Sequence, residues 1–157
     1  MGSNTNPVVS PTGEGLVYSV VGDTYTFKAV SEDTGGAYST FEFFIPPQHG
    51  SPPHIHHRED ETFYILEGEL LFQVGDHNIV LSAGSFVHAP KGIPHSFKNV
   101  GTTPARTFTT AIPAGLENFF EEVGYLVKDK DTPVPITLED QIKKMREVAP
   151  KYGVEIL

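Results

Sequence analysis

Between residues 16 and 111 the chain consists of short segments rich in Val, Ile, Phe, Tyr and Thr, separated by clusters of turn residues. Residues of the first kind are enriched in strands, whereas Gly, Pro, Asn and Asp mark turns. No apolar period of 3.6 residues extends over a helical length here. The pattern therefore predicts an all-β sandwich or small barrel. We expect about ten strands, at residues 16–20, 24–29, 38–45, 53–57, 61–66, 69–74, 77–82, 85–89, 95–99 and 105–112.

The C-terminal part of the chain has a different pattern, with apolar residues at helical spacing. Leu116, Phe119, Phe120 and Val123 form one such stripe, and Gly124 follows where a helix commonly ends. The stripe predicts a helix that covers one end of the β body. Phe119 and Phe120 could instead close the mouth of a cavity.

A second helix is expected after Thr137, which is a good N-cap residue, with Asp140 in the capping-box position. These patterns divide the chain into three parts. We expect a flexible N-terminal arm (1–15), a β-barrel (16–115) and a C-terminal helical segment (116–157) packed on the barrel.

Composition narrows the chemistry of this chain of 157 residues. Its 11 Lys and Arg against 20 Asp and Glu give a charge of -9, so no basic surface for nucleic acid is expected. No apolar run is long enough to span a membrane, and we expect a cytoplasmic protein. Cysteine is absent and seven histidines are present, so any transition-metal site must use imidazole and carboxylate ligands.

Histidines are concentrated in the run HGSPPHIHHREDETFYILEGE. Because side chains alternate along a strand, His54 and His56 project to one face and His57 to the other. Glu61 lies an odd number of residues beyond His56, so a bend within 57–60 is needed to bring it to the same face. We expect His57 and the charged run Arg58 to Asp60 to be solvated.

A second fragment, GSFVHAPKGIPHSFKN, contains a turn that returns the chain beside the first cluster. His95 shares a face with Phe97 and is expected to point inward. The inward-facing candidates in the barrel are Phe41, Phe43, Phe63, Phe72, Phe86, Phe97 and Phe108, and His88 alternates in phase with Phe86. With no inward Lys or Arg, the cavity is expected to be apolar and suited to a flat aromatic or other hydrophobic molecule.

The two fragments resemble the paired motifs of the cupin superfamily. His54, His56, Glu61 and Gly68 match the first motif, and Gly84, Pro90, Gly92, His95 and Asn99 match the second. The first motif usually opens with Gly where this chain has Gln48. Residues before and after the motifs look like those of small single-domain bacterial cupins that are likened to quercetin 2,3-dioxygenase.

The resemblance implies an antiparallel jelly-roll β-barrel with one metal ion bound by His54, His56, Glu61 and His95. Three imidazoles and one carboxylate suit Fe, Mn, Ni, Co, Cu or Zn and do not choose among them. We expect a dioxygenase that acts on an apolar aromatic or enolic, flavonol-like small molecule, with Glu61 as a metal ligand and general base.

Two alternatives remain open: a non-catalytic cupin that binds or senses a small ligand, and a metal-dependent isomerase or lyase. A homodimer is also expected, in which the N-terminal arm and strand 16–20 could complete a partner's sheet.

Overall fold

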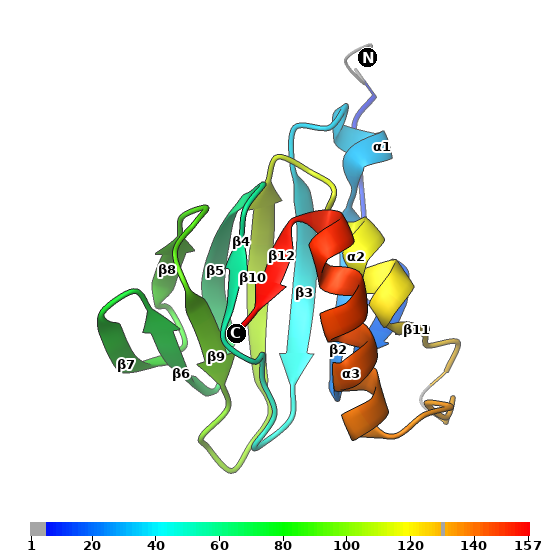
Figure 1. Ribbon diagram of the computed structural model, residues 1–157. Helices are drawn as coiled ribbons and strands as arrows, with labels where there is room; N and C mark the ends of the chain where they lie inside the picture. Colours follow the sequence, from blue (N-terminus) through cyan, green and yellow to red (C-terminus); the bar gives the residue numbers. More distant parts are fainter. Residues whose placement is uncertain (1–5, 130) are drawn as a thin grey trace.

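The computed structural model describes residues 6–129 and 131–157 and shows a mostly β protein (Figure 1). Its strands are β1 (Val17–Val20), β2 (Asp23–Ala29), β3 (Ser39–Ile45), β4 (His54–His56), β5 (Asp60–Glu67), β6 (Glu69–Val74), β7 (His77–Ser82), β8 (Phe86–Ala89), β9 (His95–Lys98), β10 (Ala105–Ile112), β11 (Tyr125–Leu126) and β12 (Val154–Ile156). The helices are α1 (Ser31–Thr34), α2 (Leu116–Val123), α3 (Leu138–Val148) and the 3-10 helix η1 (Ala149–Tyr152).

The strands form two antiparallel sheets. One has the order β11-β1-β2-β3-β10-β5-β8, and the other has the order β12-β4-β9-β6-β7. The predicted all-β jelly-roll fold is confirmed, and each of the expected strands occurs with its ends within one residue of the expected bounds. No helix in the described part of the chain is long and apolar enough to cross a membrane.

Three short elements were not expected from the sequence: α1, β11 and β12. The segment after residue 116 is therefore not helical throughout. Its last strand, β12, pairs with β4, with Val154 opposite His56 and Ile156 opposite His54. β11 pairs with β1, so the edge of β1 that we expected to be free for a partner chain is covered by this chain itself.

Both C-terminal helices occur where the sequence predicts them, and they lie side by side against one side of the barrel (Figure 1). The Thr137 hydroxyl accepts the Asp140 backbone N–H, so the expected N-cap of α3 is present. The buried Gln141 side chain donates to the Ser19 carbonyl at 3.1 Å and fixes α3 to β1. Of the expected N-terminal arm, residues 1–5 lie outside the described residues, and residues 6–15 contain no strand.

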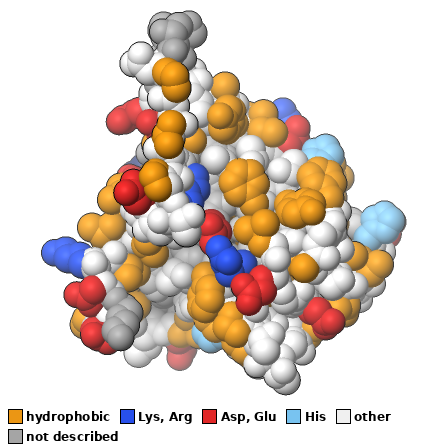
Figure 2. Space-filling view, turned by 180° about the vertical axis from the view of Figure 1, so that it is seen from behind, with side chains coloured by type: hydrophobic (Ala, Val, Ile, Leu, Met, Phe, Trp, Pro, Cys, Tyr) orange, Lys and Arg blue, Asp and Glu red, His pale blue; other side chains and the backbone are white. Residues whose placement is uncertain are grey.

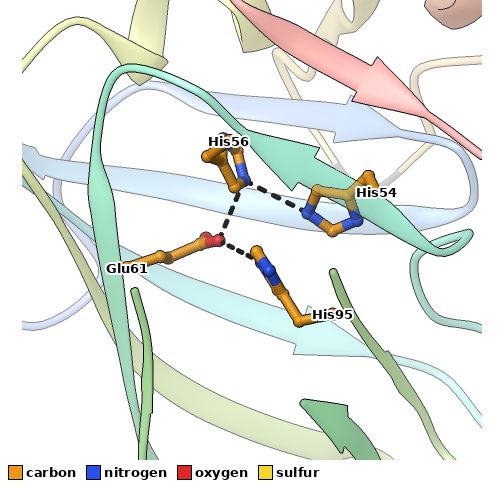
Figure 3. Close-up of side chains that lie close together, drawn as sticks. All are labelled: His54, His56, Glu61 and His95. Carbon is orange, nitrogen blue, oxygen red and sulfur yellow. Dashed lines mark hydrogen bonds and ion pairs between the residues drawn. The ribbon is translucent and has the colours of Figure 1, made fainter. Parts of the chain in front are cut away.

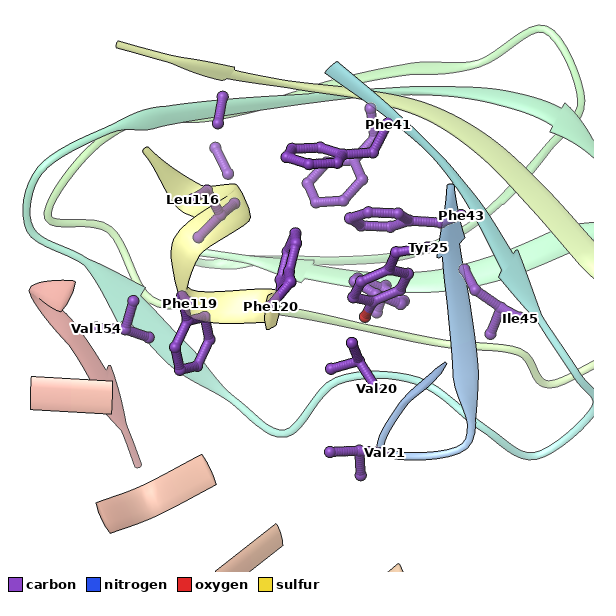
Figure 4. Packing of buried hydrophobic residues seen from close by; sticks show 14 of the residues in the cluster. Val20, Val21, Tyr25, Phe41, Phe43, Ile45, Leu116, Phe119, Phe120 and Val154 are labelled. Atoms are coloured by element: carbon purple, nitrogen blue, oxygen red, sulfur yellow. The ribbon is translucent and has the colours of Figure 1, made fainter. Parts of the chain in front are cut away.

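Aromatic side chains fill the space between the sheets and α2 (Figure 4). The Phe120 ring lies 4.7 Å from that of Tyr25 and 5.2 Å from that of Phe41, in edge-to-face geometry. The inward prediction is confirmed for Phe41, Phe43, Phe63, Phe72 and Phe97, which are all buried.

The inward prediction is wrong for Phe86 and Phe108, which are 62% and 43% exposed. Alternation along a strand groups residues into two faces but does not say which face is inside. In β8 and β10 the smaller residues face inward, among them Val87 and Thr109.

Candidate metal centre

Three strands bring together the four residues singled out by the sequence (Figure 3). β4 carries His54 and His56, β5 carries Glu61, and β9 carries His95, which lies opposite His54. All four side chains are buried, and one potential ligand atom from each lies within 4.8 Å of the others. The arrangement could hold a metal ion.

The bend expected between His56 and Glu61 is present. β4 ends at His56, β5 begins at Asp60, and the residues between them are not in a strand. The backbone N–H of His57 donates to the Gly153 carbonyl at 2.8 Å, which fixes the bend against the residues before β12. Because of this irregularity, Glu61 reaches the same side as His56.

The inner atoms of the cluster are close together. His54 Nε2 lies 3.1 Å from His56 Nε2, and Glu61 Oε2 lies 3.0 Å from the Nε2 atoms of both His56 and His95. Such convergence of nitrogen and oxygen donors is unfavourable unless a cation or shared protons lie between them.

Each imidazole is oriented by a partner on its outer nitrogen. His54 Nδ1 donates to the Pro52 carbonyl at 2.8 Å, and His95 Nδ1 donates to the Ile93 carbonyl at 3.1 Å. His56 Nδ1 lies 2.6 Å from Glu59 Oε1. With Nδ1 protonated, all three Nε2 lone pairs point toward the centre, which is the orientation that metal-binding histidines adopt. The residues therefore fit a divalent transition metal.

The cluster perturbs the pKa values of its members in the metal-free protein. For His54, burial lowers the pKa to about 3, reinforced by His95 and His56. For His56, burial also lowers the pKa, but the Glu61 charge and the bonds to Glu59 and Glu61 outweigh it and raise the pKa to about 9. Burial raises the pKa of Glu61, but interaction with His56 and His95 holds that pKa well below its usual range. A cation that replaces the His56 proton preserves the attraction for Glu61.

Glu59 was missed by the sequence analysis, which expected the run 58–60 to be solvated. Its side chain is buried and bound to His56. The sequence contains one signal for this role, a carboxylate three residues after a candidate ligand, within a turn that can fold it back.

The remaining histidines lie outside the cluster. His57 is exposed, as expected, and pairs with Glu155 at 2.9 Å, and His77 is also exposed. His88 is also exposed and does not face the cavity, although its alternation in phase with Phe86 had suggested an inward position. The reason is the same as for Phe86, because β8 turns Val87 and Ala89 inward.

A cavity of about 40 Å³ adjoins the cluster. His54, His56 and Glu61 form its polar wall, and most of the remaining lining is apolar, with neither Lys nor Arg among the described lining residues. Phe119 and Phe120 from α2 and Met145 from α3 contribute to this lining, so the helices close the cavity. The expected apolar character is present, but the volume accommodates only a few water molecules and is below the range of typical ligand pockets.

Comparison with known proteins identifies the family. A sequence profile described as the cupin domain matches residues 41–111, which include both motifs and all four cluster residues. Residues 41–111 therefore form a cupin domain. The departure at Gln48 also has a structural counterpart, because Gln48 adopts a φ of 70°, in the left-handed region that favours glycine.

Among curated proteins, this chain is 26% identical over 118 residues to quercetin 2,3-dioxygenase of Bacillus subtilis, an alignment covering 75% of this chain and 35% of the relative. It is 27% identical over 79 residues to an uncharacterized protein of Methanocaldococcus jannaschii, covering 50% of this chain and 63% of that one. The chain thus spans less than two thirds of the length of each.

Solved structures show the same fold. An RmlC-like cupin from Shewanella frigidimarina superposes with a TM-score of 0.63 at 16% identity, covering 73% of this chain and 98% of that one. A predicted oxalate decarboxylase from Thermotoga maritima superposes with a TM-score of 0.60 at 23% identity, covering 69% of this chain and 99% of that one.

Proposed function

We propose that this cupin is a mononuclear metal enzyme, a dioxygenase for a small apolar molecule that carries an enolic or hydroxyl oxygen. The observation that carries the proposal is the apolar cavity whose polar wall is formed by His54, His56 and Glu61. A divalent transition metal held by these residues and His95 would supply Lewis acidity and, where redox-active, electron transfer to oxygen. The similarity to quercetin 2,3-dioxygenase supports the proposal of a dioxygenase reaction.

The histidines and the glutamate of the cluster have different roles in this proposal. His54, His56 and His95 are held with Nε2 toward the centre and provide neutral ligands. Glu61 is the carboxylate of the cluster, and we assign it the second role of accepting the proton of a substrate hydroxyl. The apolar lining would bind the substrate's hydrocarbon part and exclude water.

The volume of the cavity bears on the substrate. At about 40 Å³ it is too small for a flavonol unless α2 and α3 move away from the barrel. Compact enolic molecules therefore fit the proposal better than flavonols do. The absence of cationic groups from the described lining argues against a sugar phosphate.

Oxygen consumption tests this proposal. The protein would be loaded separately with Fe(II), Mn(II), Ni(II) and Co(II) and mixed with a panel of enolic aromatics and smaller enediols. We expect oxygen uptake with at least one combination, and its loss in Glu61→Gln. Absence of uptake with every combination would contradict the oxygenase assignment, and turnover without oxygen would indicate the isomerase or lyase alternative. Ligand binding that persists in Glu61→Gln, without turnover, would indicate a binding or sensing protein.

We also propose that the chain forms a homodimer through the outer face of the larger sheet, where hydrophobic side chains gather (Figure 2). Phe108, Tyr64 and Phe86 lie opposite one another on β10, β5 and β8, and they are 43%, 46% and 62% exposed. With Phe44 beside this row, the aromatic residues expose roughly 400 Å². That is close to the apolar share of the ~800 Å² that each partner buries in a standard interface.

Charge placement favours a second copy as the occupant of this face. On one side of the aromatic row Arg106 pairs with Glu42 and Glu67, and on the other side lie Thr110 and Thr62. A two-fold axis along the row would place the charged side of one copy over the threonine side of the other. Arg106 and Glu67 of one copy would then lie over Thr110 and Thr62 of the other and not over their own counterparts.

A further inference from the structure

A buried polar pair lies beside the proposed metal centre and takes no part in the functions assigned so far. Tyr25 lines the same cavity as His54, His56 and Glu61. Its ring stacks on Phe43 with centroids 3.8 Å apart and meets the edge of Phe120 (Figure 4). The ring is therefore held firmly within an apolar wall, while its hydroxyl is a polar group there.

The hydroxyl has one hydrogen bond among the described residues, a long one of 3.4 Å to Oδ2 of Asp23. Asp23 is 1% exposed, and its Oδ1 has no partner in the described structure. Buried polar groups without good partners cost stability and are rare without a functional reason. Apolar residues of similar size would fill these positions at lower cost.

Asp23 can hold the tyrosine in a donating state. Burial raises the pKa of Asp23 to about 8, although the bond from Tyr25 opposes the rise. The carboxyl group is therefore largely protonated at neutral pH, and its O–H can donate to Tyr25 Oη. The tyrosine proton is then free to point into the cavity. Burial also raises the pKa of Tyr25, with contributions from Asp23 and Glu61, so the phenol keeps its proton.

We propose that Tyr25 is the residue that orients the ligand at the metal centre, by donating a hydrogen bond to a second polar atom of that ligand, and that Asp23 positions the Tyr25 hydroxyl for this purpose. The inference rests on the proposed metal centre. It deepens that proposal by selecting ligands with two acceptor atoms, one for the metal and one for Tyr25. An enediol or a hydroxyketone has this chemistry, whereas a ligand with one oxygen does not.

Azide binding to the cobalt-loaded protein tests the inference, because azide is small and has a second acceptor nitrogen. Its affinity is measured from the shift of the visible Co(II) absorption bands. We expect Tyr25→Phe to bind azide about 10-fold or more weakly, since the lost hydrogen bond is made to a charged ligand. Cobalt affinity should be unchanged. Tyr18→Phe is the matched control, because the described residues that line the cavity do not include Tyr18.

Variants of Asp23 separate positioning from simple packing. Asp23→Asn retains an N–H donor toward Tyr25 Oη and should keep most of the azide affinity. Asp23→Leu has no such donor, and its azide affinity should fall about as much as that of Tyr25→Phe. In the metal-free protein, the double variant Asp23→Leu, Tyr25→Phe should leave the melting temperature unchanged or raise it, because both poorly satisfied polar groups are removed together. A structural role predicts the opposite change.

The outcomes distinguish failure of the metal centre from failure of the role assigned to Tyr25. If the cobalt-loaded wild type and Tyr25→Phe bind azide equally, the role of Tyr25 is wrong while the metal centre stands. If the double variant lowers the melting temperature while Tyr25→Phe leaves azide affinity unchanged, the pair is structural. If the wild type takes up no cobalt, both the metal centre and this inference are overturned.

Discussion

At the scale of single residues, His56 lies between two carboxylates. Its Nδ1 faces Glu59 at 2.6 Å and its Nε2 faces Glu61 at 3.0 Å. A carboxylate on the outer nitrogen of a metal-binding imidazole fixes the ring and increases its basicity. Glu59 is therefore expected to strengthen metal binding without touching the ion.

This role gives a prediction for Glu59→Gln. The variant should fold normally but bind Zn(II) or Co(II) about 10–100-fold more weakly, because the amide carries no charge to support His56. Isothermal titration with a competing chelator measures the affinity. His57→Gln serves as the control, since His57 is exposed and pairs outside the cluster. Equal affinities for both variants and the wild type would contradict the role of Glu59.

Asp23 gives a prediction about pH. Its pKa rises from 3.8 in the unfolded chain to about 8 in the folded protein. Between these values the folded state holds a proton that the unfolded state has released, so the contribution of Asp23 to stability declines as pH rises from about 4 to about 8. Asp23→Asn removes this dependence. Denaturant unfolding of the metal-free wild type and variant is measured at pH 5 and pH 8. The variant should exceed the wild type in free energy of unfolding by more at pH 8 than at pH 5. An equal difference at the two pH values would contradict the raised pKa of Asp23.

The residues that sequence reasoning identified and those it missed differ in one physical respect. The residues that were identified lie on strands, where alternation groups the side chains into two faces, and their spacing matches a motif. They are His54, His56, Glu61 and His95. Glu59 lies in a bend, where no periodicity applies. Asp23 is the first residue of β2, and from the sequence it reads as an ordinary turn residue.

At the scale of elements, α2 and α3 connect the barrel core to the cavity. Phe120 contacts Tyr25, Phe41 and Phe43, which come from β2 and β3. Helical spacing was enough to predict this helix and its buried face. β11 and β12 were not predictable in the same way, because strands of two and three residues are specified by the neighbours they pair with and not by their own pattern.

Phe120→Ala tests the packing of α2. Removal of this buried ring should lower the free energy of unfolding by about 3–5 kcal/mol, as for other large-to-small core substitutions. Phe86→Ala is the matched control, because Phe86 is 62% exposed and a surface change usually alters stability by less than about 0.5 kcal/mol. Urea unfolding measures both. Similar losses in the two variants would contradict the described core.

At the scale of the whole molecule, the larger sheet has one face toward the core and one aromatic face toward solvent. The sequence alone assigned Phe86 and Phe108 to the interior, because a large aromatic residue in a strand is more often buried. Their exposure on β8 and β10, on either side of Tyr64 on β5, is the basis for the proposed homodimer.

The double variant Phe86→Lys, Phe108→Lys tests this interface. Sedimentation velocity should show a dimer for the wild type and a monomer for the variant, since two charges on each copy would meet in an apolar contact. Circular dichroism should be unchanged because both positions are exposed. A wild-type monomer, or a variant that remains dimeric, would contradict the proposed interface.

The proposed function depends on one metal ion held by His54, His56, Glu61 and His95. Elemental analysis of the protein after reconstitution and gel filtration measures how much metal is bound per chain, with His95→Ala as the comparison. We expect one divalent transition-metal ion per chain in the wild type, removed by chelator or by low pH as the histidines become protonated, and little metal in His95→Ala. A wild type that retains no metal, or a His95→Ala variant that retains as much as the wild type, would contradict this expectation.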